Sequence, residues 1–152
     1  MAITRAEAQE QILEALGSAT EQIGLAVECL GEAYEQLSES EGDRLEMELF
    51  GPAQKAFGLA RRTRDGFSSR TGTRAAALLQ LPVGARSQGA RAFIDKATQA
   101  AEIADHEVAE LQDTMLPIEA GDPELRAGLA AVREQLAAIP AASRDFVRTL
   151  GR

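Results

Sequence analysis

The sequence contains no tryptophan, and aromatic residues of all kinds make up only 4% of the chain. A hydrophobic core therefore has to be built mainly from alanine, leucine, isoleucine and valine. Hydrophobic residues make up 45% of the 152 residues, and a chain of this length suffices for one domain but not for two ordinary ones. Small aliphatic side chains favour closely packed helices, so we expect a single all-α domain, residues 1–152.

Long apolar runs are absent as well. No stretch approaches the roughly 18 uninterrupted apolar residues that a membrane-spanning helix needs. The opening residues also lack the apolar run of a secretory signal. From these observations we expect a cytoplasmic protein that has no membrane partner.

Cysteine is represented by Cys29 alone, which excludes an internal disulfide and is compatible with a reducing compartment. A nucleophilic thiol needs a basic group nearby, whereas the acidic residues Glu28 and Glu32 flank this one. We therefore interpret Cys29 as a small packing residue rather than a catalytic one.

Histidine is also represented once, by His106, with Glu102 and Glu110 four residues away on either side. That spacing could place three metal ligands on one helix face. The apolar periodicity puts His106 on the outward face, however, which favours a solvated position, and one histidine excludes the paired Glu-x-x-His units of di-iron bundles. Phosphate-binding loops and nucleophile elbows are missing too. We predict no catalytic residue, no metal site and no cofactor.

Residues 4–38 carry the clearest pattern, a seven-residue repeat that predicts one long helix opened by a capping box of Thr4 and Glu7. A leucine-rich seam at positions a and d of the heptad is typical of a coiled coil. Position b is a stripe of glutamates that faces away from this seam. The a residues are Leu13, Thr20, Val27 and Tyr34, the d residues are Leu16, Ile23, Leu30 and Leu37, and the glutamates are Glu7, Glu14, Glu21, Glu28 and Glu35.

Small residues flank the seam on both sides. Each interior glycine costs a helix about 1 kcal/mol relative to alanine, so something must compensate for three of them. We expect close approach of another helix backbone across this face, within the chain first and in a partner chain as the alternative. The predicted packing face consists of Gly17, Gly24 and Gly31 at position e and Ala19, Ala26 and Ala33 at position g.

Three more helices are predicted from caps and apolar periodicity, over residues 43–65, 88–116 and 122–150. Gly51-Pro52 should kink or split the first of them and Pro140 should kink the last. Short turns between most helices favour an up-down-up-down antiparallel four-helix bundle with long coiled-coil-like helices. The predicted seam of the 88–116 helix is Ala90, Ile94, Ala97, Ala101, Ala104, Val108, Leu111 and Met115.

Residues 66–87 form the one long connection, rich in serine, threonine, glycine and arginine. Connections of this length are usually functional or disordered. Arginines there could contact an anion or nucleic-acid phosphates, although a net charge of −8 opposes binding of a polyanion. We favour the alternative that they neutralise the glutamate stripe of the first helix. The candidate anion contacts are Arg61, Arg62, Arg64, Arg70 and Arg74.

Three segments in the second half of the chain, residues 87–90, 111–122 and 148–152, resemble stretches of uncharacterised helical proteins from actinobacteria. The resemblance implies no activity, substrate or functional residue. The residues themselves favour a non-enzymatic interaction or scaffold protein that binds a protein partner or self-associates. The alternatives are an anion or nucleic-acid contact through residues 61–91 and a small-molecule carrier with a cavity inside the bundle.

Overall fold

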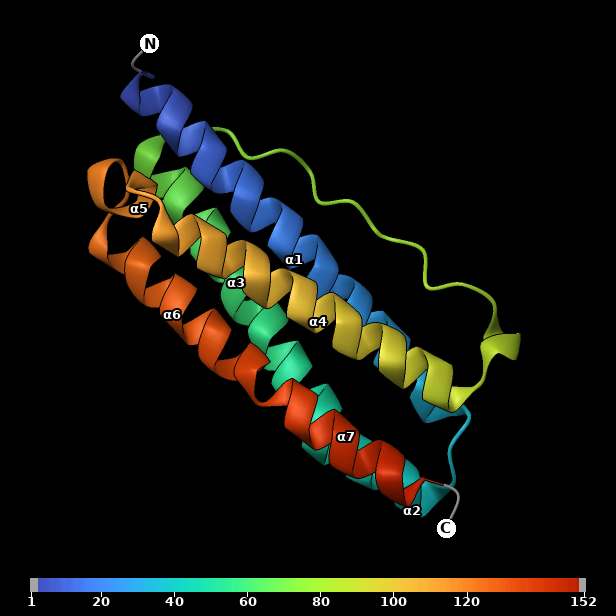
Figure 1. Ribbon diagram of the computed structural model, residues 1–152. Coiled ribbons are helices and arrows are strands. Elements are labelled where there is room, and N and C mark those ends of the chain that lie inside the picture. The colour runs from blue at the N-terminus through green and yellow to red at the C-terminus, as the bar shows by residue number, and fades with distance from the viewer. Residues whose placement is uncertain (1–2, 151–152) are drawn as a thin grey trace.

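The computed structural model describes residues 3–150, and within that range the chain forms helices and no strand, which confirms the all-α prediction. The long helices pack side by side, with α1 against α3 and α4, and α6 on the far side against the same two helices (Figure 1). The elements are α1 (Arg5–Glu35), α2 (Glu39–Leu45), a π-helical turn (Glu46–Phe50), α3 (Gly51–Thr71), a 3-10 turn (Arg86–Gln88), α4 (Ala90–Asp113), α5 (Leu116–Glu119), α6 (Pro123–Ala137) and α7 (Ile139–Thr149).

Helix α1 begins after Thr4, whose hydroxyl accepts a hydrogen bond from the backbone N–H of Glu7 at 3.0 Å. Its buried ridge follows positions d and g of the heptad rather than the predicted a and d. The a position turns outward along the helix, from Leu13 at 2% exposure to Tyr34 at 43%. A seven-residue repeat drifts by about 20° per heptad on a helix of 3.6 residues per turn. The ridge is Ile12, Leu16, Ala19, Ile23, Ala26, Leu30 and Ala33.

The second helical stretch differs from the predicted 43–65 at both ends. It begins earlier because Ser38, not Asp43, is the cap: Ser38 and Glu41 form a capping box. It ends later, at Thr71, where Gly72 takes a left-handed conformation at φ 71° that favours glycine. The irregularity expected at Gly51-Pro52 is a π-helical turn, in which the N–H of Gly51 reaches the carbonyl of Glu46.

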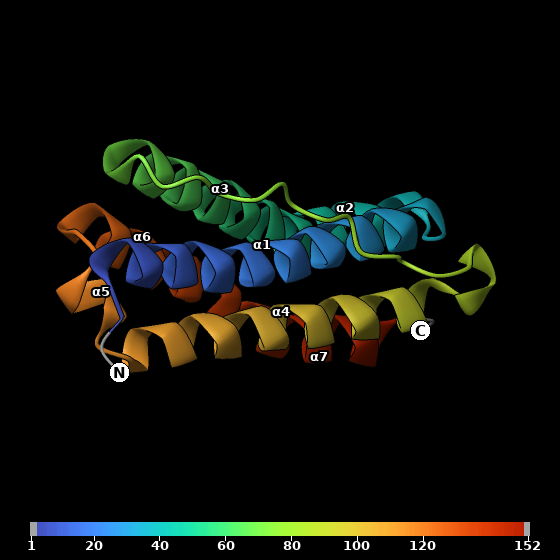
Figure 2. The ribbon, with the colours of Figure 1, turned by 90° about the horizontal axis from the view of Figure 1, so that it is seen from above.

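The predicted alternating order of the helices is wrong, because α3 and α4 run in the same direction. After α3 the chain returns along α1, where the Thr73 hydroxyl donates to Gln9 at 3.2 Å and Gln36 donates to the Arg86 carbonyl at 3.0 Å. Gln9 and Gln36 lie about 40 Å apart at 1.5 Å per residue. An extended segment from Thr73 to Arg86 spans about that distance at 3.3 Å per residue. The connection is therefore a full-length crossover (Figures 1 and 2).

The two C-terminal helices are nearly continuous. Asp122 caps α6 by accepting a hydrogen bond from the N–H of Leu125 at 2.8 Å, and Pro123 occupies the first turn. The break expected at Pro140 lies at Ala138, two residues before the proline. The buried residues keep the predicted spacing and are Leu125, Leu129, Val132, Leu136, Ile139, Ser143 and Phe146.

Helix α4 buries the predicted seam except at its ends. Met115 is 56% exposed because α4 ends at Asp113, so the seam residue falls beyond the last turn. None of the helices within residues 3–150 has the length and apolar character needed to cross a membrane.

Candidate functional site

An extended segment crosses the outer face of α1, and we call residues 72–85 the strap. It leaves the end of α3, runs along α1 and reaches the start of α4 (Figure 2). No strap residue is buried; Ala75 and Val83 are half-buried against the core, and Leu79 is 68% exposed. The outer face of α1 is thus covered by a single layer of extended chain.

Two side chains of α3 donate hydrogen bonds to backbone carbonyls in the first part of the strap. The Ser68 hydroxyl donates to the carbonyl of Thr73 at 2.6 Å. The guanidinium of Arg64 donates from Nη2 to the carbonyl of Ala76. Both hydrogen bonds are made to a backbone atom, so neither depends on which side chain the strap carries at that position.

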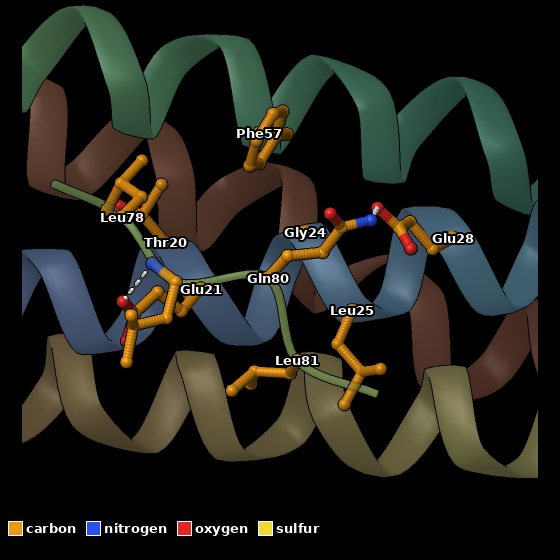
Figure 3. A pocket seen from close by; sticks show the side chains of 10 residues that line it. Thr20, Glu21, Gly24, Leu25, Glu28, Phe57, Leu78, Gln80 and Leu81 are labelled. Atoms are coloured by element: carbon orange, nitrogen blue, oxygen red, sulfur yellow. Dashed lines mark hydrogen bonds between the residues drawn. The ribbon is translucent and has the colours of Figure 1, made fainter. Parts of the chain in front are cut away.

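Helices α1 and α4 hold the remainder. The Glu21 carboxylate accepts a hydrogen bond from the backbone N–H of Leu79 at 2.6 Å, and the Glu28 carboxylate accepts one from the Gln80 side chain at 2.6 Å (Figure 3). From α4, the Lys96 ammonium donates to the carbonyls of residues 82 and 83 at 3.1 and 2.9 Å. Charged groups from two further helices therefore bind the strap, mostly at backbone atoms.

A cavity of about 240 Å³ lies between the strap, α1 and α3. Drug-sized ligand pockets are usually about 300 to 1,000 Å³, so this space is smaller than a typical ligand site. The hydroxyl of Thr20 on its floor already donates to the carbonyl of Leu16 at 2.6 Å. Its lining is Thr20, Glu21, Gly24, Leu25, Glu28, Phe57, Leu78, Leu79, Gln80 and Leu81 (Figure 3).

Arg64 is a buried charge with incomplete partners. It is 6% exposed, and its Nε atom is buried without a hydrogen bond. Within residues 3–150 no carboxylate forms an ion pair with it. Gly17 leaves the room that this side chain occupies, since a Cβ there would lie 3.1 Å from Arg64 Nε. A buried cation without a counterion is costly, and this one lies directly under the strap.

The predicted packing face divides into two rows with different neighbours. Ala19, Ala26 and Ala33 are fully buried in the core ridge of α1. The glycines lie beside it, and the closest neighbours of Gly17 and Gly24 are side chains of α3 rather than a helix backbone. A Cβ at Gly24 would lie 3.1 Å from Phe57, whereas one at Gly31 would meet nothing within 4 Å. Within the chain no helix backbone approaches these glycines closely, and close approach of a partner chain stays a prediction.

Close helix approach occurs instead at Gly128 of α6. A Cβ there would overlap the side chain of Thr63 on α3, including its Cβ at 2.9 Å. Gly128 does not belong to a seven-residue repeat of glycines such as the one in α1. The isolated glycine gave no signal of its packing role.

The five candidate arginines do not form one surface. Arg64 is buried, and Arg70 pairs with Asp122 at 2.7 Å, which lowers the pKa of that carboxyl. Arg61 lies over the Phe57 ring at 5.6 Å, and Arg62 and Arg74 are exposed. This arrangement offers no concentrated anion-binding patch.

Within residues 3–150 none of the five candidate arginines forms an ion pair with a glutamate of the stripe, and neutralisation of the stripe over longer distances stays a prediction. Glu21 and Glu28 bind the strap through Leu79 and Gln80, and the one arginine of the connection that pairs with α1, Arg86, contacts Glu32 at 3.4 Å. Ser68 and Lys96 were not singled out from the sequence, and Glu21 and Glu28 were named there only as members of the glutamate stripe. Nothing distinguishes them there from other surface positions on amphipathic helices.

The remaining sequence candidates lie apart from the strap site or take no part in it. His106 lies 2.9 Å from Glu110, with both side chains largely exposed. Over the described part of the chain, no group of three metal-ligating side chains comes together. Cys29 is fully buried, and this burial raises the pKa of its thiol.

Comparison with known proteins found no family model, no curated protein and no solved structure that matches this chain. The resemblance to actinobacterial helical proteins stays a prediction from the sequence.

Proposed function

We propose that this chain is a non-enzymatic helical protein that binds a segment of another protein across the outer face of α1. The observation that carries the proposal is that this face already holds an extended peptide, the strap, through directed hydrogen bonds from three helices. Arg64, Glu21 and Lys96 belong to α3, α1 and α4, and each binds a strap backbone atom. A surface arranged to hold one extended segment is suited to recognising another.

The core beneath the strap supports the same proposal. Residues that form the buried ridge of α1, such as Leu16 and Ile23, are 0% exposed, and the strap contributes no buried side chain to that core. Releasing the strap would therefore remove no fully buried side chain from that core. The helical body is a stable platform on which the outer layer is exchangeable.

Affinity capture with a matched pair of variants tests the proposal. A partner that binds this face should be retained by the wild-type chain and by a control changed on α6, Glu134→Gln. It should be lost from the double variant Glu21→Gln/Lys96→Met, in which the acceptor at position 21 loses its charge and the donor at position 96 is removed. Equal retention of the purified partner by all three proteins would overturn the proposal.

Self-association is a second candidate, favoured by exposed apolar residues at one end of the molecule. Ile3, Met115 and Ile118 are 46%, 56% and 64% exposed. They belong to the start of the chain and to the α5 region, which contact each other through the Arg5 guanidinium and the Glu119 carbonyl at 3.0 Å. Light scattering should show an oligomer that Met115→Asp/Ile118→Asp dissociates; a monomer in both proteins would remove this candidate.

We also propose coiled-coil-like packing between α1 and α4, which make the most extensive helix contact in the described chain. Both helices bury apolar residues at alternating steps of three and four, which is the spacing of a coiled-coil seam. A measured crossing angle near +20° in an experimental structure would support this packing, and one near −50° would contradict it.

A further inference from the structure

We infer that the strap is a replaceable occupant of its site, and that an extended, uncharged, small-apolar segment of a partner protein takes its place on α1. The inference rests on the proposed function and adds the chemistry of the partner and the event that admits it. The strap covers the site in the free protein, and the partner binds when the strap is displaced.

The site binds the strap mostly through backbone atoms, and its side-chain hydrogen bonds are those of Gln80 with Glu28 and of Thr73 with Gln9. Ser68, Arg64, Glu21 and Lys96 bind backbone atoms of the strap at Thr73, Ala76, Leu79 and residues 82 and 83. Every peptide carries these carbonyl and amide groups, so any extended chain that fits the surface supplies them. A segment that binds here must place a backbone carbonyl within hydrogen-bonding distance of Arg64 and, three residues later, a backbone N–H within that distance of Glu21.

The composition of the strap indicates that of the partner segment. Residues 75–83 of the strap carry no charge and consist of alanine, leucine, glutamine, proline and valine. An acidic segment would be repelled by Glu21 and Glu28, which lie within hydrogen-bonding distance of the strap. Small residues fit the part that crosses Arg64, and half-buried aliphatic residues fit at the positions of Leu78 and Leu81.

A partner segment has to outcompete a strap that belongs to the same chain as the site. A segment tied at both ends acts at an effective concentration of about millimolar, so a partner needs contacts that the strap does not make. Arg64 offers one, because its Nε is buried without an acceptor while its Nη2 already binds Ala76. A partner that presents a second neutral acceptor here gains a hydrogen bond to a charged donor.

We expect displacement of the strap to leave the helical fold intact. No strap residue is buried, and the strap's half-buried residues pack at the edge of the core. Segments with few buried apolar contacts open at free energies well below that of global unfolding. The helical body therefore persists when the strap leaves.

A peptide with the sequence of residues 73–85 tests the inference by fluorescence anisotropy. It is added to the wild-type chain and to Leu78→Asp/Val83→Asp, which loosens the strap by changing its own half-buried side chains and leaves the helices untouched. A strap closed at least nine-tenths of the time lowers the apparent affinity about tenfold or more. We expect the loosened variant to bind the peptide at least that much more tightly.

Two controls make the result specific. A peptide carrying the same two aspartates should bind neither protein. Adding Glu21→Gln and Lys96→Met to the loosened variant should weaken binding of the unmodified peptide at least fivefold. If the aspartates unfold the chain by circular dichroism, serines at the same two positions replace them.

The inference is overturned if a folded, loosened variant does not bind the peptide, or if wild type and variant bind it equally. Either result would make the strap a simple connection between α3 and α4. The proposed function fails independently, since a natural partner whose binding ignores Glu21 and Lys96 would contradict it even where the peptide binds.

Discussion

The glycines of α1 allow a sharp prediction because positions that are equivalent in the sequence have different neighbours. Gly24 and Gly31 both occupy position e of successive heptads. A Cβ at Gly24 would lie 3.1 Å from Cε2 of Phe57, while a Cβ at Gly31 would meet no atom within 4 Å. The substitutions Gly24→Ala, Gly24→Leu and Gly31→Ala therefore separate helix propensity from packing.

The expected magnitudes follow from these neighbours. Gly31→Ala should gain about 1 kcal/mol of helix propensity without a packing cost, which raises the Tm by roughly 2 to 4 °C for a chain of this size. Gly24→Ala should gain less, because the Phe57 ring must shift by a few tenths of an ångström. Gly24→Leu should lose about 1 to 3 kcal/mol through overpacking.

Urea and thermal denaturation followed by circular dichroism measure the three differences against wild type, with the urea m-value as a check on two-state unfolding. The ranking Gly31→Ala above Gly24→Ala above Gly24→Leu is the prediction. Equal stabilisation by alanine at both positions, or a leucine at Gly24 that stabilises, would refute the assignment of Phe57 as the neighbour that limits this site.

Three further outcomes are expected. Arg64→Met should leave the free energy of unfolding unchanged or higher, since it removes a buried charge without a counterion. The same substitution should speed hydrogen exchange in the strap. A loss of more than about 3 kcal/mol in urea denaturation would contradict the expected stability. Asp122→Asn keeps the side chain that caps α6 but loses the ion pair with Arg70. Because that pair lowers the pKa of Asp122 below 3.8, the wild-type chain should be more stable than the variant at neutral pH. This difference in stability should vanish as the pH falls through the lowered pKa. A difference that persists in strong acid would show another cause. Cys29 should react with a thiol reagent at pH 8 far more slowly in the native chain than in urea, because burial raises its pKa and blocks access; equal rates would place the thiol at the surface.

The parts of the fold that could be predicted are those set by local chemistry. Thr4 and Asp122 mark the starts of α1 and α6 because a short side chain that accepts from a nearby N–H leaves a local signature. The spacing of apolar residues located the buried residues of α4 and α6, because this spacing is also a local feature of the sequence. Gly72 was missed as the end of α3, since several glycines of that region were equally suitable.

The order of the helices depends on how far the connection between α3 and α4 extends along the bundle, and the sequence pattern does not show this distance. Residues 72–85 could form a loose loop beside one end of the bundle or an extended crossover to the other end. The choice is decided by contacts with Ser68, Glu21 and Lys96, which are far away along the chain. Each of these is an ordinary helix surface residue, and their role arises only when three helices converge on one extended segment.

The glycine repeat illustrates the same limit. The sequence indicated correctly that the alanines of position g are buried, but not that Gly17 accommodates Arg64 while Gly31 faces no neighbour. A recurring residue type need not have a recurring cause, because the partner helix α3 carries no matching repeat.

Native-state hydrogen exchange tests most directly whether the strap is a separable layer on a complete helical core. The account predicts that the Leu79 amide, bonded to Glu21, exchanges through a local opening whose free energy is insensitive to low urea. Amides of the buried ridge of α1, such as that of Ile23, should exchange only with global unfolding. If the Leu79 amide shows the same free energy and the same urea dependence as that of Ile23, the strap unfolds only with the core and the account is contradicted.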